Sequence, residues 1–254
     1  MFALIVILIL ALVLIAVVVN AVQQHRNKIE LERRNEIAKN KSVVDDTEAT
    51  LLAAQHIPVT QRLIFILQRR ALNGLKMINQ LNPGVSDTKE RIKSYESTLQ
   101  ALNVDQPPPP EESFQLPQND KQVIQFIRGI KNMRAVLRSE FKKGKVDSKV
   151  FVHEDKLLER MQLRANVDTL IRRGELAMKN NQMGSARQCL EKAIGALAAQ
   201  PNPDDYIVAR QAQLEEQLRN IETSLRSANS QDVKKKQESE RNELDELFAQ
   251  KKKW

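Results

Sequence analysis

The chain begins with a long apolar run and then changes to a mixed pattern of apolar and polar positions. Phe2 to Val19 are apolar without a break, and they include no glycine, proline or charged residue. At about 1.5 Å per residue, a helix of this length is close to the thickness of a bilayer core. We therefore predict a transmembrane anchor over residues 1–22. The alternative is a signal peptide cleaved near Ala21, but the run is too long and a basic n-region is missing.

Basic residues follow the apolar run over residues 23–44, which we predict to form a juxtamembrane helix. Such residues are enriched on the cytoplasmic side of membrane spans. The expected localisation is the bacterial inner membrane, single-pass, with the N-terminus outside and the C-terminal region cytoplasmic. A plainer interpretation is that these charges solvate the helix by pairing with its glutamates. The basic residues are Arg26, Lys28, Arg33, Arg34, Lys39 and Lys41.

Apolar positions at spacings of three and four predict a helical subdomain over residues 45–102. A break is expected at Pro58, a stop at Asn82–Gly84, and a new helix near Asp87, which has a glutamate three residues later as in a capping box. Residues 103–119 hold five of the nine prolines and predict a semi-rigid linker between two helical regions. A proline-rich ligand for another protein is the alternative, but no Pro-x-x-Pro with an anchoring arginine is present.

The segment after the linker predicts an amphipathic helix that ends at Gly144. Its apolar side carries Ile127, Ile130, Leu137 and Phe141, and its other side carries Arg128, Lys131, Arg134, Arg138 and Lys142 as a basic stripe. The stripe is either a solvated face or a contact surface for an acidic protein, anionic headgroups or nucleic acid. The stripe lacks aromatic residues for base stacking, which makes nucleic acid the less favoured partner.

Small residues recur in a pattern typical of a close helical hairpin over residues 167–201. Leu170, Gly174 and Ala177 stand on the expected first helix, and Ala186, Leu190, Ala193 and Pro201 follow on and after the second. This pattern resembles one tetratricopeptide (TPR) unit, although the usual tryptophan and turn aromatic are missing. The resemblance implies a helical, non-catalytic module that holds a peptide or protein partner. We expect a TPR-like domain over residues 120–228, with Gly174, Ala186, Leu190 and Ala193 as partner-binding residues.

One TPR-like unit cannot bury its faces alone, so neighbouring helices or a second copy of the chain must cover it. Apolar stripes over residues 60–102 and 205–226 permit self-association, including coiled-coil pairing, and a homo-oligomer is therefore one of the expected states. Residues 229–254 form a charged tail that ends in a small apolar and basic motif. The tail is predicted either to fray or to bind a partner or a lipid interface through Leu247, Phe248 and Trp254.

Composition narrows the class of function further. The net charge of +8 favours acidic partners, and aromatic residues make up only 4% of the chain. The single cysteine, Cys189, excludes an intrachain disulfide, and we interpret it as a small residue on a helix face. No phosphate loop, G-x-S-x-G, H-E-x-x-H or C-x-x-C motif is present. The nearest cluster, His153 with Glu154, Asp155 and Glu159, is better explained by acidic residues at a helix start.

These patterns predict an all-α protein with an N-terminal transmembrane helix, helical hairpins and a charged, partly disordered tail. The expected function is a non-enzymatic, membrane-anchored scaffold that binds a protein partner at the cytoplasmic face, without a cofactor or metal. The alternative is a membrane tether for nucleic acid through the basic stripe. Salt dependence separates the two, because phosphate contacts weaken steeply as the salt concentration rises.

Overall fold

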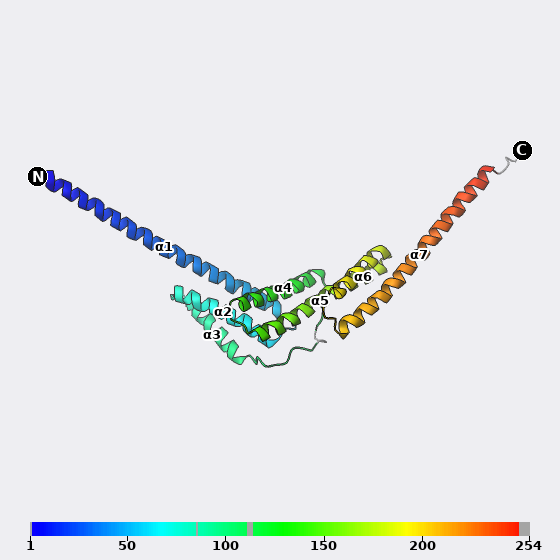
Figure 1. Cartoon of the computed structure of the whole chain (residues 1–254), viewed down its shortest axis with the longest axis horizontal. Coiled ribbons are helices and arrows are strands. Elements are labelled where there is room, and N and C mark those ends of the chain that lie inside the picture. Colours follow the sequence, from blue (N-terminus) through cyan, green and yellow to red (C-terminus); the bar gives the residue numbers. More distant parts are fainter. Residues whose placement is uncertain (1, 85, 111–113, 249–254) are drawn as a thin grey trace. The chain divides into compact units, whose positions relative to one another are not determined.

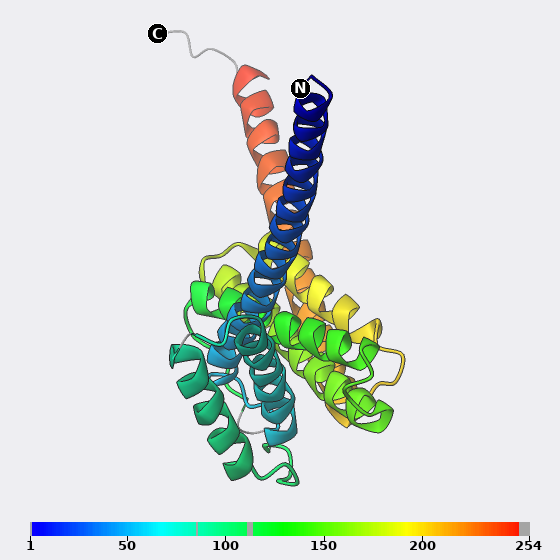
Figure 2. The ribbon, with the colours of Figure 1, turned by 90° about the vertical axis from the view of Figure 1, so that its left-hand side faces the viewer.

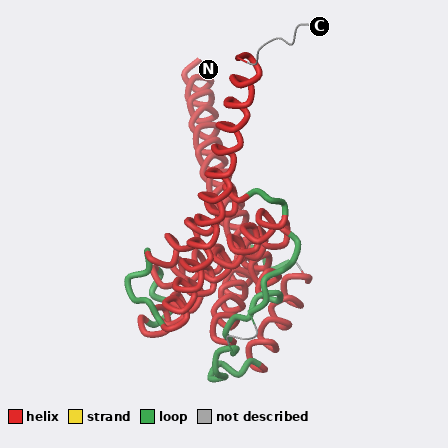
Figure 3. The backbone as a smooth tube through the Cα atoms, turned by 90° about the vertical axis from the view of Figure 1, so that its right-hand side faces the viewer, coloured by secondary structure: helices red, strands yellow, loops and turns green. Residues whose placement is uncertain are grey.

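The protein is all-α in the residues that the structure, a computed structural model, describes (Figures 1 and 3). These are residues 2–84, 86–110 and 114–248, and the side chains of residues 2–18, 228, 240 and 242–248 lie outside the description. The described helices are α1 (Phe2–Ala54), α2 (Gln61–Leu81), α3 (Ser86–Ala101), α4 (Asp120–Lys142), α5 (Ser148–Lys179), α6 (Met183–Ala198) and α7 (Asp205–Phe248).

α1 is one continuous helix of 53 residues. It covers the predicted anchor, the predicted juxtamembrane helix and the start of the predicted subdomain. It ends at Ala54, ahead of Pro58, whose ring disfavours a helical conformation in the residue before it. The predicted break is therefore confirmed, whereas the boundaries predicted at residues 22 and 44 do not interrupt the helix.

The predicted localisation is wrong on the evidence of the described residues, because none of their helices is both long enough and apolar enough to cross a membrane. The described side chains of α1 begin at Val19, and from Arg26 to Lys41 charged residues recur every one to three positions. These charged residues leave no long apolar stretch in the part of α1 whose side chains are described. The side chains of Phe2 to Val18 lie outside the description.

The structure divides into two compact units. Unit 1 contains residues 1–115 and 128–158, and unit 2 contains residues 116–127 and 159–254. The chain therefore passes from one unit to the other at three points, one in the proline-rich segment after Gln115, one within α4 and one within α5. The described residues of the proline-rich segment, 102–110 and 114–119, are outside any helix, as the sequence predicts.

In unit 1, α2 packs along the C-terminal part of α1 and against α3 (Figures 1 and 2). α2 buries Leu63, Leu67, Ala71 and Leu75 at intervals of four residues, which places them on one face of the helix. Thr60 caps its N-terminus by accepting a hydrogen bond from the backbone N–H of Leu63, over 3.0 Å. The predicted stop is confirmed, because α2 ends at Leu81 just before the Asn-Pro-Gly sequence.

The closest approach of α1 and α2 is at Gly74. A Cβ atom at this position would lie only 2.7 Å from the Cγ2 atom of Val44, which is 1% exposed. Glycine therefore lets the two backbones come together around Val44. α3 joins α1 through Glu48, whose Oε1 accepts hydrogen bonds from Arg91 Nη2 at 2.6 Å and from the Tyr95 hydroxyl at 2.8 Å.

The core of unit 2 is a single cluster contributed by α5, α6 and α7. Every seventh residue of α7, from Ile207 through Leu214 to Ile221, is buried in this cluster. Beyond Leu225, the described side chains of α7 are exposed. The structure thus covers one face of the predicted hairpin with a third helix of the same chain. The core residues are Leu163, Val167, Ile171, Ala177, Ala186, Leu190, Ala193, Leu197, Ile207, Leu214 and Ile221.

Candidate partner-binding surface

The C-terminal part of α4 has an apolar side that belongs to the core of unit 1. Ile130, Met133 and Leu137 are fully buried, at the helical spacings of three and four. Gly129 lets α4 approach the end of α1, because a Cβ there would lie 3.0 Å from Ile57 Cδ1 and 3.1 Å from Ala53 Cβ. Of the four predicted apolar positions, Ile130 and Leu137 are buried, whereas Ile127 and Phe141 are partly exposed.

The basic stripe of α4 lies largely in solvent, since burial of the apolar side fixes the rotation of the helix. Arg128, Lys131 and Lys142 are exposed, and the Arg138 side chain retains 52% of its accessible surface. We call these four residues the basic face. The first and the last lie fourteen residues apart on one helix, or about 21 Å at 1.5 Å per residue. The basic face is thus a row of cations that a partner can reach.

Arg134, the remaining predicted member of the stripe, is largely buried against α5. Its Nε and Nη2 atoms donate to the two carboxylate oxygens of Asp155 at 2.9 and 3.1 Å, which is a bidentate pair. Arg138 Nη2 donates to the same carboxylate at 3.3 Å. The hydrogen bond from Arg134 is the main reason that the pKa of Asp155 lies below its usual range. Arg134 therefore fastens α4 to α5 within unit 1.

The acidic residues after His153 have a different role from the one that the sequence suggests. α5 begins at Ser148, so Glu154 and Asp155 lie beyond the first turn, where the helix dipole no longer explains them. Glu154 is 2% exposed and accepts a hydrogen bond of 2.6 Å from the hydroxyl of Thr60. Burial raises the pKa of the Glu154 carboxyl. Within the described residues, no group of three or more histidine, cysteine or acidic side chains could hold a metal.

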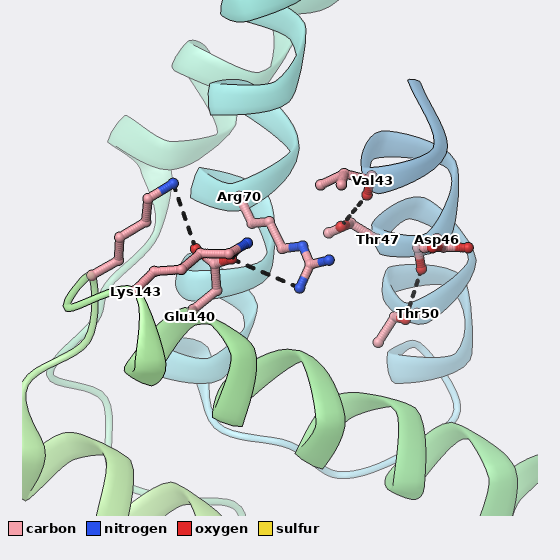
Figure 4. A network of polar contacts seen from close by, with 8 residues as sticks. Val43, Asp46, Thr47, Thr50, Arg70, Glu140 and Lys143 are labelled. Carbon is pink, nitrogen blue, oxygen red and sulfur yellow. Dashed lines mark hydrogen bonds and ion pairs between the residues drawn. The ribbon is translucent and has the colours of Figure 1, made fainter. Parts of the chain in front are cut away.

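A second buried carboxylate, Glu140, lies at the end of α4 opposite α2 (Figure 4). Lys143 Nζ donates to it at 3.0 Å, while Arg70 Nη1 and Lys145 Nζ lie 3.8 and 3.9 Å away. The chain can turn back at this point because Gly144 adopts a positive φ of 68°, as predicted for a helix C-terminus. Glu140 is 3% exposed, so these cations serve to compensate an internal charge.

The segment from Arg128 to Leu158 concentrates positive charge on the surface of unit 1. It holds nine lysines and arginines but only four acidic residues, a net charge of +5. Two of the four acidic residues, Glu140 and Glu154, are buried, and a third, Asp155, forms ion pairs with Arg134 and Arg138. Cations of the same segment lie at two of these carboxylates, while Arg128, Lys131, Lys142, Lys149 and Lys156 are exposed and make the surface basic.

The hairpin residues predicted to bind a partner lie inside unit 2. Ala186, Leu190 and Ala193 have no exposed surface, and Gly174 is also buried. A Cβ on Gly174 would meet Cys189 Cβ at 3.5 Å, an ordinary contact distance. This part of the prediction needs correction: these residues lie in the core that α5, α6 and α7 form together, where Gly174 faces α6, and they hold the fold of unit 2 together.

The tail residues give no further evidence for a binding motif. Leu247 and Phe248 are within α7, but their side chains lie outside the described residues, as does the whole of Trp254. The predicted linear motif therefore stays a prediction.

The comparisons with known proteins provide no family for this chain. No protein-family model matches it, and no curated protein and no solved structure matches it either. The resemblance to a TPR unit accordingly stays a hypothesis that rests on the residues quoted above.

Sequence reasoning did not identify Asp155 as the partner of Arg134. One signal was available, because α4 and α5 are joined by a short connection through Gly144. Consecutive helices with such a connection usually pack antiparallel, which brings an acidic residue early in the second helix beside basic residues late in the first. The exact register of the two helices still depends on their packing.

Proposed function

We propose that this chain is a non-enzymatic helical scaffold that binds an acidic protein partner through the basic face of α4. The observation that carries the proposal is the division of α4 into a buried apolar side and an exposed row of Arg128, Lys131, Arg138 and Lys142. The opposite side of the helix is fixed in the core, so the row keeps its geometry without a partner. Such a preorganised row lowers the entropic cost of binding.

An acidic protein fits this surface better than nucleic acid does. The basic face offers cations along one helix, and the two aromatic residues between Arg128 and Leu158, Phe141 and Phe151, are partly buried and stack on each other with ring centroids 4.2 Å apart. Proteins that bind single strands usually add aromatic side chains on which bases stack. The basic face spans about 21 Å, which corresponds to about four turns of a partner helix. The proposed function therefore moves the binding surface from the hairpin of unit 2 to α4.

Charge reversal at two exposed positions tests this proposal. A variant with Arg128→Glu and Lys131→Glu should lose a partner that is recovered from cells with the wild-type chain by crosslinking and mass spectrometry. The matched control carries Lys179→Glu and Lys192→Glu, two exposed positions of unit 2, and has the same net charge. The control should retain the partner.

Nuclease treatment and salt titration complete the test. Loss of the recovered material on nuclease treatment would show that the bound species is nucleic acid. A logarithmic salt slope that grows by about 0.9 for each phosphate contacted would support the same conclusion. Equal recovery with the charge-reversed variant and the control would refute the assignment of the basic face.

A further inference from the structure

Four exposed cations cannot by themselves account for selective binding of a protein. Exposed ion pairs each contribute only about 0.2–1 kcal/mol and weaken as salt is added. Binding energy in protein interfaces is usually concentrated in a few desolvated contacts, surrounded by polar residues that add little. A selective surface therefore needs an apolar side chain beside the basic face that a partner can cover.

Val152 of α5 is such a side chain. It is 58% exposed, and among residues 128–158, all of which are described, it is the one strongly exposed large hydrophobic residue. It precedes Asp155 by three positions, so the two lie on one side of α5. Asp155 in turn binds Arg134 and Arg138 of α4. Val152 thus lies next to the point where the basic face meets α5.

The surroundings of Val152 are also basic. Lys149 and Lys156, one turn before and one turn after it, are exposed. A partner that reaches Val152 must pass between cations, so a purely apolar segment would leave these ammonium groups facing an uncharged surface. A segment with carboxylates on both sides of an apolar residue satisfies the lysines and the valine together.

We infer that Val152 is the apolar anchor of the proposed binding surface, and that the partner is an acidic protein segment with an apolar residue between its carboxylates. The inference rests on the proposed function, and it extends the surface from α4 to α5. It also explains how the chain would select protein over other polyanions, because a phosphate backbone has no apolar group to offer Val152.

Two soluble random copolymers serve as probes, one of glutamate with alanine and one of glutamate with tyrosine, prepared in the same ratio and length. The full chain should bind the tyrosine copolymer about fivefold more tightly than the alanine copolymer, which is the ratio expected from partial burial of one valine. Val152→Ser should abolish this preference while leaving the affinity for the alanine copolymer unchanged.

Val208 provides a matched control, because it is 57% exposed and lies on α7 of unit 2. Val208→Ser should keep the full preference for the tyrosine copolymer. A preference of equal size in the Val152→Ser variant would overturn the anchor assignment, while binding that still depends on Arg128 and Lys131 would preserve the proposed function. Binding of either copolymer that is insensitive to charge reversal at Arg128 and Lys131 would overturn both.

Discussion

Substituting Gly74 by alanine tests the packing of α1 against α2 most directly. The new Cβ would lie 2.7 Å from Val44 Cγ2, about 0.7 Å closer than an ordinary contact of about 3.4 Å. Val44 is 1% exposed and β-branched, so its methyl group has no free space and no alternative rotamer that is readily adopted. The two helices must therefore move apart to accommodate the alanine.

The expected effect is the difference between two opposing contributions. Overpacking of a core typically costs about 1–3 kcal/mol, whereas alanine in a helix interior is favoured over glycine by about 0.5–1 kcal/mol. Gly74→Ala should therefore lower the free energy of unfolding of unit 1 by about 1–2 kcal/mol. Urea unfolding followed by circular dichroism measures the change, and hydrogen exchange of the α2 amides confirms that it belongs to unit 1.

Two further variants separate the steric effect from helix propensity. Gly195→Ala in α6 meets no atom within 4 Å, so it should raise stability by about 0.5–1 kcal/mol. In the double variant with Val44→Ala, the cost of Gly74→Ala should fall by at least about 1 kcal/mol, because the clashing methyl group is gone. If Gly74→Ala stabilises the protein as Gly195→Ala does, the close approach of α1 and α2 is incorrect.

The remaining predictions concern buried and paired charges. The lowered pKa of Asp155 stabilises the fold above pH 3.8, the unfolded pKa, and this stabilisation is lost as the pH falls below 3.8. The stability of Asp155→Asn should therefore depend less on pH than that of wild type in the range below pH 3.8. The raised pKa of Glu154 affects stability in the opposite direction: its contribution to the free energy of unfolding is full below pH 4.5, the unfolded pKa, and is lost as the pH rises. Wild type should therefore gain stability on acidification towards pH 4.5, and Glu154→Gln should lack this gain. Glu140→Ala should cost about 3–5 kcal/mol in urea unfolding, since it leaves Arg70 without its carboxylate, and an unchanged midpoint would contradict that. Leu190→Asp should abolish the thermal transition of unit 2 in calorimetry, because Leu190 is fully buried in its core.

Local signals in the sequence identified most of the helix ends. Pro58 and the Asn-Pro-Gly sequence mark the ends of α1 and α2 because proline is incompatible with a continuing helix. Gly144 marks the end of α4, since only glycine adopts a positive φ at little cost. The start of α5 was predicted about six residues too late, although the sequence holds a capping residue there: Asp147 stands directly before Ser148, and its Oδ1 accepts a hydrogen bond of 2.8 Å from the backbone N–H of Lys149.

Local sequence patterns are enough to predict that the chain is helical and that α4 has one apolar and one basic side, because helical periodicity is a property of neighbouring residues. Which polar residues stay in solvent depends on how the helices pack against one another. Arg134 and Arg138 carry the same charge one turn apart on the stripe and both bind Asp155, yet the Arg134 side chain keeps only 14% of its accessible surface whereas that of Arg138 keeps 52%. The small residues of the hairpin were recognised as packing positions, but whether α7 or a partner covers them depends on long-range packing that local patterns do not encode.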